Sequence, residues 1–282
     1  MIEITDKEFN ILRDIMYEVT GVHLTDSKKH LAVFRLRKRL SELKIEHVRD
    51  YLTLIKKPGS PELETFINAI TTNESSFYRY PQQFDWLVKK ALPDIIERKK
   101  RGLQREIRIW SGACATGEEP YSIVIACREF FKKHPDWKLV IHASDINSTV
   151  LEYSREGKYS ERSVQNIPSF LSKLYFSPVM VDGKCIKRKM FQLDSEIIKS
   201  VEFFHHNLLK SFGHGYFDVI FLRNVMIYFN QESKRKVIGL LENNLNDGGY
   251  FFTSIIETLT GVSCSLKLLE CGIYQKIEKT GS

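Results

Sequence analysis

The segment IWSGACATGEEPYS, residues 109–122, joins an apolar run to an amphipathic run through a string of small residues. This layout is typical of the strand-to-helix turn that cradles a nucleotide in an α/β domain. The turn lacks both the lysine of a phosphate-binding loop and the GxGxxG spacing of a dinucleotide-binding loop. Instead, Glu118 and Glu119 follow Gly117, where they would repel a phosphate. Acids in a first helical turn also complement the helix dipole, so a plain strand–helix turn is an alternative interpretation.

Apolar runs and helical stretches alternate on both sides of this segment. Strand patterns occupy residues 106–112, 137–145, 201–207, 217–224 and 246–256. A helical pattern at 83–100 precedes them, and another follows the small-residue turn, with Pro120 in its first turn, where the missing N–H does no harm. The alternation predicts a largely parallel, doubly wound sheet, with ligands bound beyond the carboxyl ends of the strands.

One stretch of the α/β region breaks the alternation. Residues 175–193 place Asp182 and Gly183 between two β-rich runs, which is a strong hairpin signal. We predict a small antiparallel insertion over residues 177–200.

The first 71 residues carry helical patterns and no strand signal. Thr5 and Glu8 have the spacing of a capping box, and the helix that they open is expected to stop at Gly21. Further helices are predicted at residues 26–43, 48–55 and 62–70. We therefore expect a helical domain at 1–71, a linker at 72–82 and an α/β domain at 83–282.

The composition bounds the class of protein. A chain of 282 residues with 43% hydrophobic residues can bury a large core, and a net charge of +7 suits an acidic partner, although many ordinary enzymes are as basic. The five cysteines form no CxxC pair and no zinc-type cluster with histidines. The start of the chain lacks the apolar core of a signal peptide, and no run is long enough to span a membrane. We expect a cytoplasmic protein with reduced thiols, no metal and no membrane insertion.

The carboxylates suggest the ligand. Asp145 ends the second strand, where a carboxylate accepts hydrogen bonds from both ribose hydroxyls of a nucleoside. Acids beside the small-residue turn favour positive charge. A ligand with a ribose, positive charge and no phosphate is S-adenosylmethionine.

Five segments, taken in order, resemble the CheR family of chemotaxis receptor methyltransferases. They are TTNESSFYRYPQQF (71–84), RIWSGACATGEEPYS (108–122), ASDI (143–146), HNLL (206–209) and FDVIFLRNVMIYF (217–229). The resemblance covers nearly the whole chain. It implies a Rossmann-like methyltransferase domain behind a small all-α domain. It also implies transfer of a methyl group from S-adenosylmethionine to glutamates of bacterial chemotaxis receptors, which gives adaptation and leaves S-adenosylhomocysteine.

The resemblance also implies roles for individual residues. Cofactor contacts are expected from Asn73, Ser75, Arg79, Glu119, Asp145, Asn207, Leu208, Arg223 and Asn224. Arg79 and Tyr228 are expected at the methyl-transfer site, with Arg79 orienting the incoming carboxylate. Three alternatives stay open: Glu118 in place of Glu119, a strand-end cap at Asn207, and a core tyrosine at Tyr228.

A glutamate acceptor needs no general base, because its carboxylate has a pKa of about 4.3 and is ionised at pH 7. We accordingly interpret His142, His205 and His206, which lie on or near predicted strands, as structural residues.

The second predicted helix offers a surface for the receptor. Val33, Leu36, Leu40 and Leu43 make its apolar stripe, and Lys28, Arg35 and Arg39 share an adjacent face that we expect to be exposed. Such a face would complement acidic receptor helices, although a merely solvated face is the alternative. The β insertion could also bind a receptor's C-terminal peptide by strand addition, which the sequence does not decide.

Two departures from the family pattern bear on function. Ala115 stands where the loop usually has serine, and SIIET at 254–258 replaces a stretch of small and polar residues, which puts the exact substrate in doubt. A nucleic-acid methyltransferase is a second hypothesis, but RNVMIY (223–228) stands where an Asn/Asp-Pro-Pro-aromatic motif is expected. A non-catalytic module that binds S-adenosylmethionine is the third. We expect a monomer that acts on receptors and binds no nucleic acid.

Overall fold

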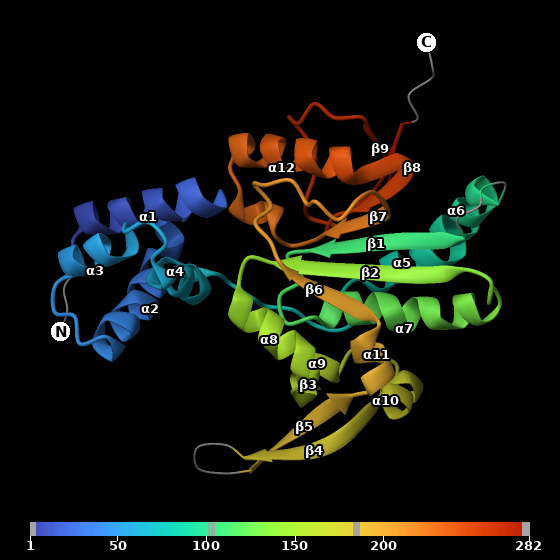
Figure 1. Ribbon diagram of the computed structural model, residues 1–282, viewed down its shortest axis with the longest axis horizontal. Coiled ribbons are helices and arrows are strands. Elements are labelled where there is room, and N and C mark those ends of the chain that lie inside the picture. Colours follow the sequence, from blue (N-terminus) through green and yellow to red (C-terminus); the bar gives the residue numbers. More distant parts are fainter. Residues whose placement is uncertain (1–3, 101, 103–104, 183–186, 278–282) are drawn as a thin grey trace.

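A bundle of short helices forms the N-terminal part of the computed structural model, which describes residues 4–100, 102, 105–182 and 187–277 (Figure 1). Its elements are α1 (Asp6–Thr20), the 3₁₀ turn η1 (Asp26–Lys28), α2 (Lys29–Glu42), α3 (Val48–Ile55) and α4 (Pro61–Ile70). The predicted capping box of Thr5 and Glu8 is present, and Gly21 ends α1 with φ 74°. Apolar side chains from all four helices fill a separate core that includes Phe9, Leu36 and Phe66.

A seven-stranded sheet forms the centre of the C-terminal domain, in the order β6-β2-β1-β7-β8-β10-β9. Its strands are β1 (Glu106–Gly112), β2 (Lys138–Asp145), β6 (Val201–His205), β7 (Phe217–Leu222), β8 (Leu245–Phe252), β9 (Leu266–Glu270) and β10 (Ile273–Lys276). The first five strands in this order pair in parallel, so the predicted parallel sheet is confirmed. The antiparallel strands β9 and β10 extend one edge and were not predicted.

Helices cover both faces of this sheet, as the doubly wound prediction requires (Figure 1). They are α5 (Pro81–Trp86), a π-helical turn η2 (Leu87–Ala91), α6 (Leu92–Lys99), α7 (Glu118–Lys132), α8 (Ser148–Glu156), α9 (Glu161–Val164), α10 (Ser169–Tyr175), α11 (Ser195–Lys199), the 3₁₀ turn η3 (Met226–Tyr228) and α12 (Gln231–Asn244). One apolar cluster joins the sheet to α5, α6 and α7, and another joins it to α12. None of the described helices is both long and apolar enough to cross a membrane.

A small antiparallel sheet projects from the α/β domain, below α8 in Figure 1. The predicted hairpin is β4 (Phe176–Asp182) and β5 (Lys187–Leu193), in a register that pairs Phe176 with Leu193. A short strand that was not predicted, β3 (Lys158–Tyr159), pairs with β5 and attaches the hairpin to the domain. Gly183, expected in the hairpin turn, lies outside the described residues.

Hydrogen bonds join the two domains on opposite sides of a pocket. On one side the backbone N–H of His23 donates to Tyr228 O (2.8 Å), beside a β-bridge between Val22 and Phe229. On the other side the Asn147 amide donates to the Thr71 hydroxyl at 2.8 Å. The helical domain is therefore part of the pocket wall.

Candidate active site

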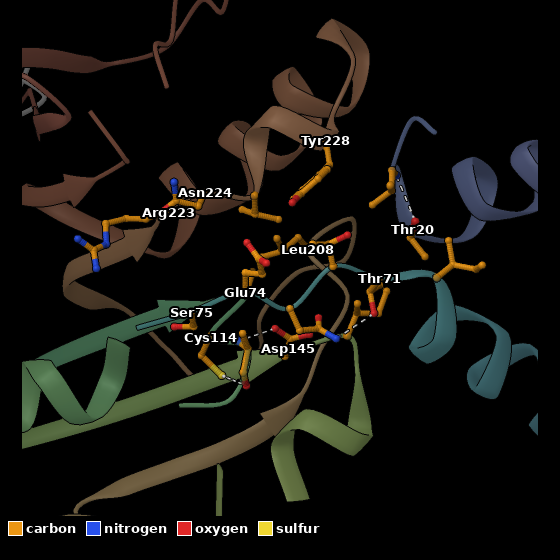
Figure 2. Close-up of a pocket in the computed structure, with 18 of the residues that line it drawn as sticks. Thr20, Thr71, Glu74, Ser75, Cys114, Asp145, Leu208, Arg223, Asn224 and Tyr228 are labelled. Carbon is orange, nitrogen blue, oxygen red and sulfur yellow. Dashed lines mark hydrogen bonds between the residues drawn. The ribbon is translucent and has the colours of Figure 1, made fainter. Parts of the chain in front are cut away.

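The pocket opens at the carboxyl ends of β1, β2, β6 and β7, where ligands bind in sheets of this type. The residues labelled in Figure 2 come from three parts of the chain. Thr20 and Thr71 belong to the helical domain, and Glu74 and Ser75 belong to the linker. The others lie at the carboxyl ends of β1, β2, β6 and β7 or in the loops that follow: Cys114, Asp145, Leu208, Arg223, Asn224 and Tyr228. Each of the nine predicted cofactor ligands lines this pocket, as do Lys28 and Tyr228.

The turn after β1 is held in an unusual backbone conformation. Ala113 and Ala115 have positive φ angles of 54° and 49°, which cost an L-residue roughly 1–2 kcal/mol each. Gly117 has φ 89°, and a Cβ there would lie 3.0 Å from the Ser154 side chain. The backbone N–H of Ala115 donates to Asp145 Oδ2 at 2.9 Å. The main chain makes this contact, so the alanine in place of serine leaves it intact.

Asp145 sits at the end of β2 with only 7% of its surface exposed. One carboxylate oxygen accepts the N–H of Ala115 and the other accepts the N–H of Asn147, both at 2.9 Å. Burial raises its pKa, and these backbone hydrogen bonds oppose that rise. A carboxylate has about four lone-pair positions, so Asp145 retains acceptor capacity for a diol on the pocket side.

The two glutamates at the start of α7 point to different places. Glu119 lines the pocket, accepts the Ser111 hydroxyl at 2.7 Å and forms an ion pair with Arg223 Nε at 2.6 Å. Glu118 is buried beneath the turn, where it accepts the Thr116 hydroxyl at 2.6 Å and burial raises its pKa. Glu118, the alternative to Glu119 as a cofactor ligand, does not line the pocket. Only Glu119 reaches the pocket, and Arg223 already pairs with it.

Arg223 connects the sheet to the linker. Its side chain is 2% exposed and donates to the backbone oxygen of Arg79 (2.6 Å) and to Gln83 Oε1 (2.9 Å), besides Glu119. The next residue, Asn224, has φ 61° and an amide 3.4 Å from the Tyr80 hydroxyl. The linker is thus fastened over the pocket by the strand-end residues that were predicted to bind the cofactor.

The residues that follow β6 lie on the pocket wall. Leu208 projects into the pocket (Figure 2). The Asn207 amide instead donates to Val19 O at 2.6 Å and accepts the N–H of Leu209 at 2.9 Å, so its side chain links the two domains and caps the strand end. His206, interpreted as structural, also lies on the pocket wall, and burial lowers its pKa to about 4. It is therefore neutral at pH 7.

Tyr228 and Lys28 meet across the domain boundary. The Lys28 ammonium lies 3.8 Å from the centroid of the Tyr228 ring, and burial lowers the pKa of Lys28. Tyr228 is half-buried on the pocket wall, so the alternative of a core tyrosine is wrong. The sequence pointed to Lys28 only as one member of a helix face. Its position at the pocket depends on a contact between domains that periodicity does not report.

The expected basic face of α2 is not the exposed surface that was predicted. Arg39 forms two hydrogen bonds with the buried Glu62 carboxylate, at 2.7 and 2.8 Å. Arg35 donates to the carbonyls of Ile70 (3.0 Å) and Thr71 (2.8 Å), at the end of α4. Both guanidinium groups stabilise the helical domain, and neither is a free, exposed charge.

Several pocket residues were given no role in the sequence analysis. Thr20 and Thr71 face the pocket from the helical domain, and Glu74 faces it from the linker (Figure 2). The sequence could have pointed to Thr71 and Glu74 because they lie within the motif at 71–84. Thr20 has no such signal, because it looks like an ordinary residue in the last turn of a helix.

The charges around the pocket match S-adenosylmethionine, which carries an ammonium, a sulfonium and a carboxylate. Asp145, Glu119 and Glu74 supply negative charge, and Lys28, Arg79 and Arg223 supply positive charge. A zwitterionic ligand fits this mixed wall better than a phosphate or a simple cation does. Among the described residues, no cluster of three or more histidine, cysteine or acidic side chains has the geometry to hold a metal ion.

Comparisons with known proteins agree with this site. Residues 73–274 match the model of the CheR methyltransferase SAM-binding domain, and residues 7–71 match that of the CheR methyltransferase all-alpha domain. A chemotaxis protein methyltransferase 2 from Vibrio cholerae is 36% identical over 93% of this chain and 89% of its own length. A chemotaxis protein methyltransferase from Borreliella burgdorferi is 33% identical over 98% of this chain and 96% of its own. A third relative, chemotaxis protein methyltransferase 2 from Pseudomonas aeruginosa, is 34% identical over 96% and 93%. The chain therefore belongs to the CheR family of S-adenosylmethionine-dependent chemotaxis methyltransferases.

Proposed function

We propose that this enzyme transfers the methyl group of S-adenosylmethionine to glutamate side-chain carboxylates of cytoplasmic receptor helices, forming methyl esters and so giving adaptation in chemotaxis. The observation that carries the proposal is the contact of the Lys28 ammonium with the Tyr228 ring, in a pocket that Arg79 also lines. Two cations beside the methyl-transfer end suit an anionic acceptor. Among the described residues that line the pocket, no histidine is paired with a carboxylate to act as a general base, and an ionised glutamate requires none.

The chain's own groups divide the work of holding the reactants. S-adenosylmethionine, when bound, supplies a methyl group on a positively charged sulfur. Asp145 accepts the ribose hydroxyls and Glu119 faces the amino end. Leu208 packs against the adenine, while Asn73 and Ser75 contact the cofactor from the linker. These roles agree with the positions of the residues on the pocket wall.

Two other pocket residues, Arg79 and Tyr228, align the receptor carboxylate that accepts the methyl group. Arg79 orients the incoming carboxylate, and Tyr228 limits the directions from which it approaches. Holding the oxygen, carbon and sulfur in line supplies much of the rate acceleration in such a transfer. The pocket lies between two domains, which also exclude water from the negative acceptor carboxylate and the positive sulfonium. These opposite charges neutralise one another as the methyl group is transferred. An Arg79 that paired too tightly with the carboxylate would weaken the nucleophile, so its role is positioning.

Receptor recognition is assigned to the rim of the pocket. Lys28 meets the negative charge of the target glutamate, whereas Arg35 and Arg39 act indirectly, by fixing α2 against α4. Ile255 and Ile256, in the stretch that departs from the family pattern, are 47% and 67% exposed. We propose that Ile255 and Ile256 contact apolar residues that flank the target glutamate on the receptor helix.

The test is transfer of tritiated methyl groups to receptor membranes, with release of methanol in base as the signature of a carboxyl methyl ester. Full-length and tail-clipped receptors, run side by side, report whether a C-terminal peptide contributes. Arg79→Ala should lose most of the transfer, whereas Lys132→Ala, which removes an exposed charge on α7, should retain it. Base-stable label on RNA would indicate a nucleic-acid methyltransferase. Calorimetric binding of S-adenosylmethionine without any transfer would indicate a non-catalytic module.

A further inference from the structure

A buried carboxylate joins the loop after β7, which lines the pocket, to the loop after β8. Glu257 is 5% exposed and follows β8, at the end of the segment Thr253–Glu257. Its Oε2 accepts the N–H of Asn224 at 2.8 Å, and its Oε1 accepts the N–H of Ile227 at 3.3 Å. Both donors belong to the loop that follows β7. Glu257 does not line the pocket itself.

The same carboxylate also fixes its own loop. Oε2 accepts the N–H of Ser254 at 3.0 Å, and the backbone N–H of Glu257 donates to Ser254 O at 3.1 Å. The Thr253 hydroxyl donates to the backbone oxygen of Glu257 at 3.2 Å. Because Ser254 and Thr253 are fully buried at the end of β8, this side of the arrangement is anchored in the sheet.

The loop after β7 needs such an anchor. Asn224 adopts φ 61°, a left-handed conformation that non-glycine residues hold only when their surroundings enforce it. Its N–H makes the 2.8 Å bond to Glu257. Ile227, the second donor, directly precedes Tyr228. Asn224 and Tyr228 both face the pocket (Figure 2), so Glu257 acts on two pocket residues through their backbone.

We propose that Glu257 is a positioning residue for methyl transfer, which sets the places of Asn224 and Tyr228 by holding the backbone of their loop against the end of β8. Since the acceptor in this scheme is a receptor glutamate, the inference rests on the proposed function. Among the nine predicted cofactor contacts, only Asn224 is hydrogen-bonded to Glu257, whereas Asp145, Glu119 and the linker belong to elements that Glu257 does not touch. Loss of Glu257 therefore lowers turnover much more than it lowers cofactor affinity.

Two substitutions test this assignment. Glu257→Ala removes all three side-chain bonds. Glu257→Gln keeps one oxygen for Asn224 and Ser254 but turns an amide N–H₂ toward the N–H of Ile227. A misplacement of about 1 Å costs on the order of 100-fold in rate, so we expect kcat to fall about 100-fold for Ala and about 10-fold for Gln. The dissociation constant of S-adenosylhomocysteine, measured by calorimetry, should stay close to that of the unmodified chain. If Glu257→Ala does not fold, Glu257→Gln carries the test.

Glu242→Gln is the matched control. Glu242 also holds a loop by accepting a backbone N–H, that of Ser265 at 2.5 Å, but it lies on α12 and does not line the pocket. Its variant should keep kcat. Amide hydrogen exchange gives a readout that needs no receptor: the N–H groups of Asn224 and Ile227 should lose protection in the Glu257 variants. Unchanged exchange, a kcat within about 3-fold of the unmodified chain, or an equal loss of kcat in Glu242→Gln would overturn the assignment. If the unmodified chain methylates no receptor, the proposed function fails, and exchange alone decides the role of Glu257.

Discussion

Arg223→Met should destabilise the protein strongly, because it leaves the buried Glu119 carboxylate without its cationic partner. The side chains of Arg223 and Glu119 are 2% and 11% exposed, and their closest N–O distance is 2.6 Å. Arg223 also donates to Arg79 O and to Gln83 Oε1. Methionine retains the apolar volume but provides none of these donors. Removing one partner of a buried ion pair costs about 3–5 kcal/mol. At roughly 2–4 °C per kcal/mol for a unit of this size, the melting temperature should fall by about 6–20 °C.

Calorimetry and urea unfolding of the full chain measure this loss. The double variant Arg223→Met/Glu119→Gln should be more stable than Arg223→Met alone, because glutamine removes the stranded charge. Lys89→Met is the matched control, since it removes a cation from an exposed pair with Asp85 and should change stability little. A loss below about 1 kcal/mol for Arg223→Met, the range of exposed pairs, would refute the reasoning. So would a double variant less stable than the single one.

Three further predictions follow from individual contacts. Arg39→Met should cost about 1–3 kcal/mol at pH 7. The Arg39 guanidinium lowers the pKa of Glu62 below its usual 4.5, so the ion pair contributes its full stability above pH 4.5. Below that pH Glu62 becomes protonated, and the loss of stability in Arg39→Met should become smaller in urea titrations. Gly117→Ala should lose about 1–3 kcal/mol in urea unfolding, more than Gly59→Ala, because both have positive φ but only the first meets a neighbouring side chain within 4 Å. Ile256→Ser should raise the KM for the receptor about 5- to 30-fold and leave calorimetric cofactor affinity unchanged; equal KM values would remove Ile256 from recognition.

Local signals were reliable where one segment determines its own structure. The capping box of Thr5 and Glu8, the stop at Gly21 and the strand–turn–helix around Gly117 depend on neighbours in sequence, and each is present. The edge strands β9 and β10 were missed because they are short and β9 carries charged and apolar residues without clear alternation. Antiparallel pairing through the turn at Gly272 defines them, and periodicity does not report pairing.

The site shows the same division between local and long-range information. The sequence placed Asp145 and Arg223 at strand ends, where they lie, because parallel topology alone brings those ends together. The sequence analysis did not predict that Arg39 pairs with Glu62, 23 residues away on another helix. One signal was overlooked: Glu62 stands four residues before Phe66, on the face of α4 that is buried. An acid on a buried helical face needs a cationic partner.

Because both domains contribute to the pocket wall, the accessibility of the linker should report how much of the protein has ligand bound in the pocket. In the helical domain, the backbone oxygen of Val19 accepts a hydrogen bond from the Asn207 amide, and Val22 forms a β-bridge with Phe229. A ligand that touches both domains binds the docked arrangement and not the separated one, so it shifts that equilibrium toward docking by mass action. Protease cleavage within residues 71–80 should therefore slow in proportion to the bound fraction of cofactor or product. Digestion rate then becomes a measure of ligand saturation that requires neither receptor nor radiolabel.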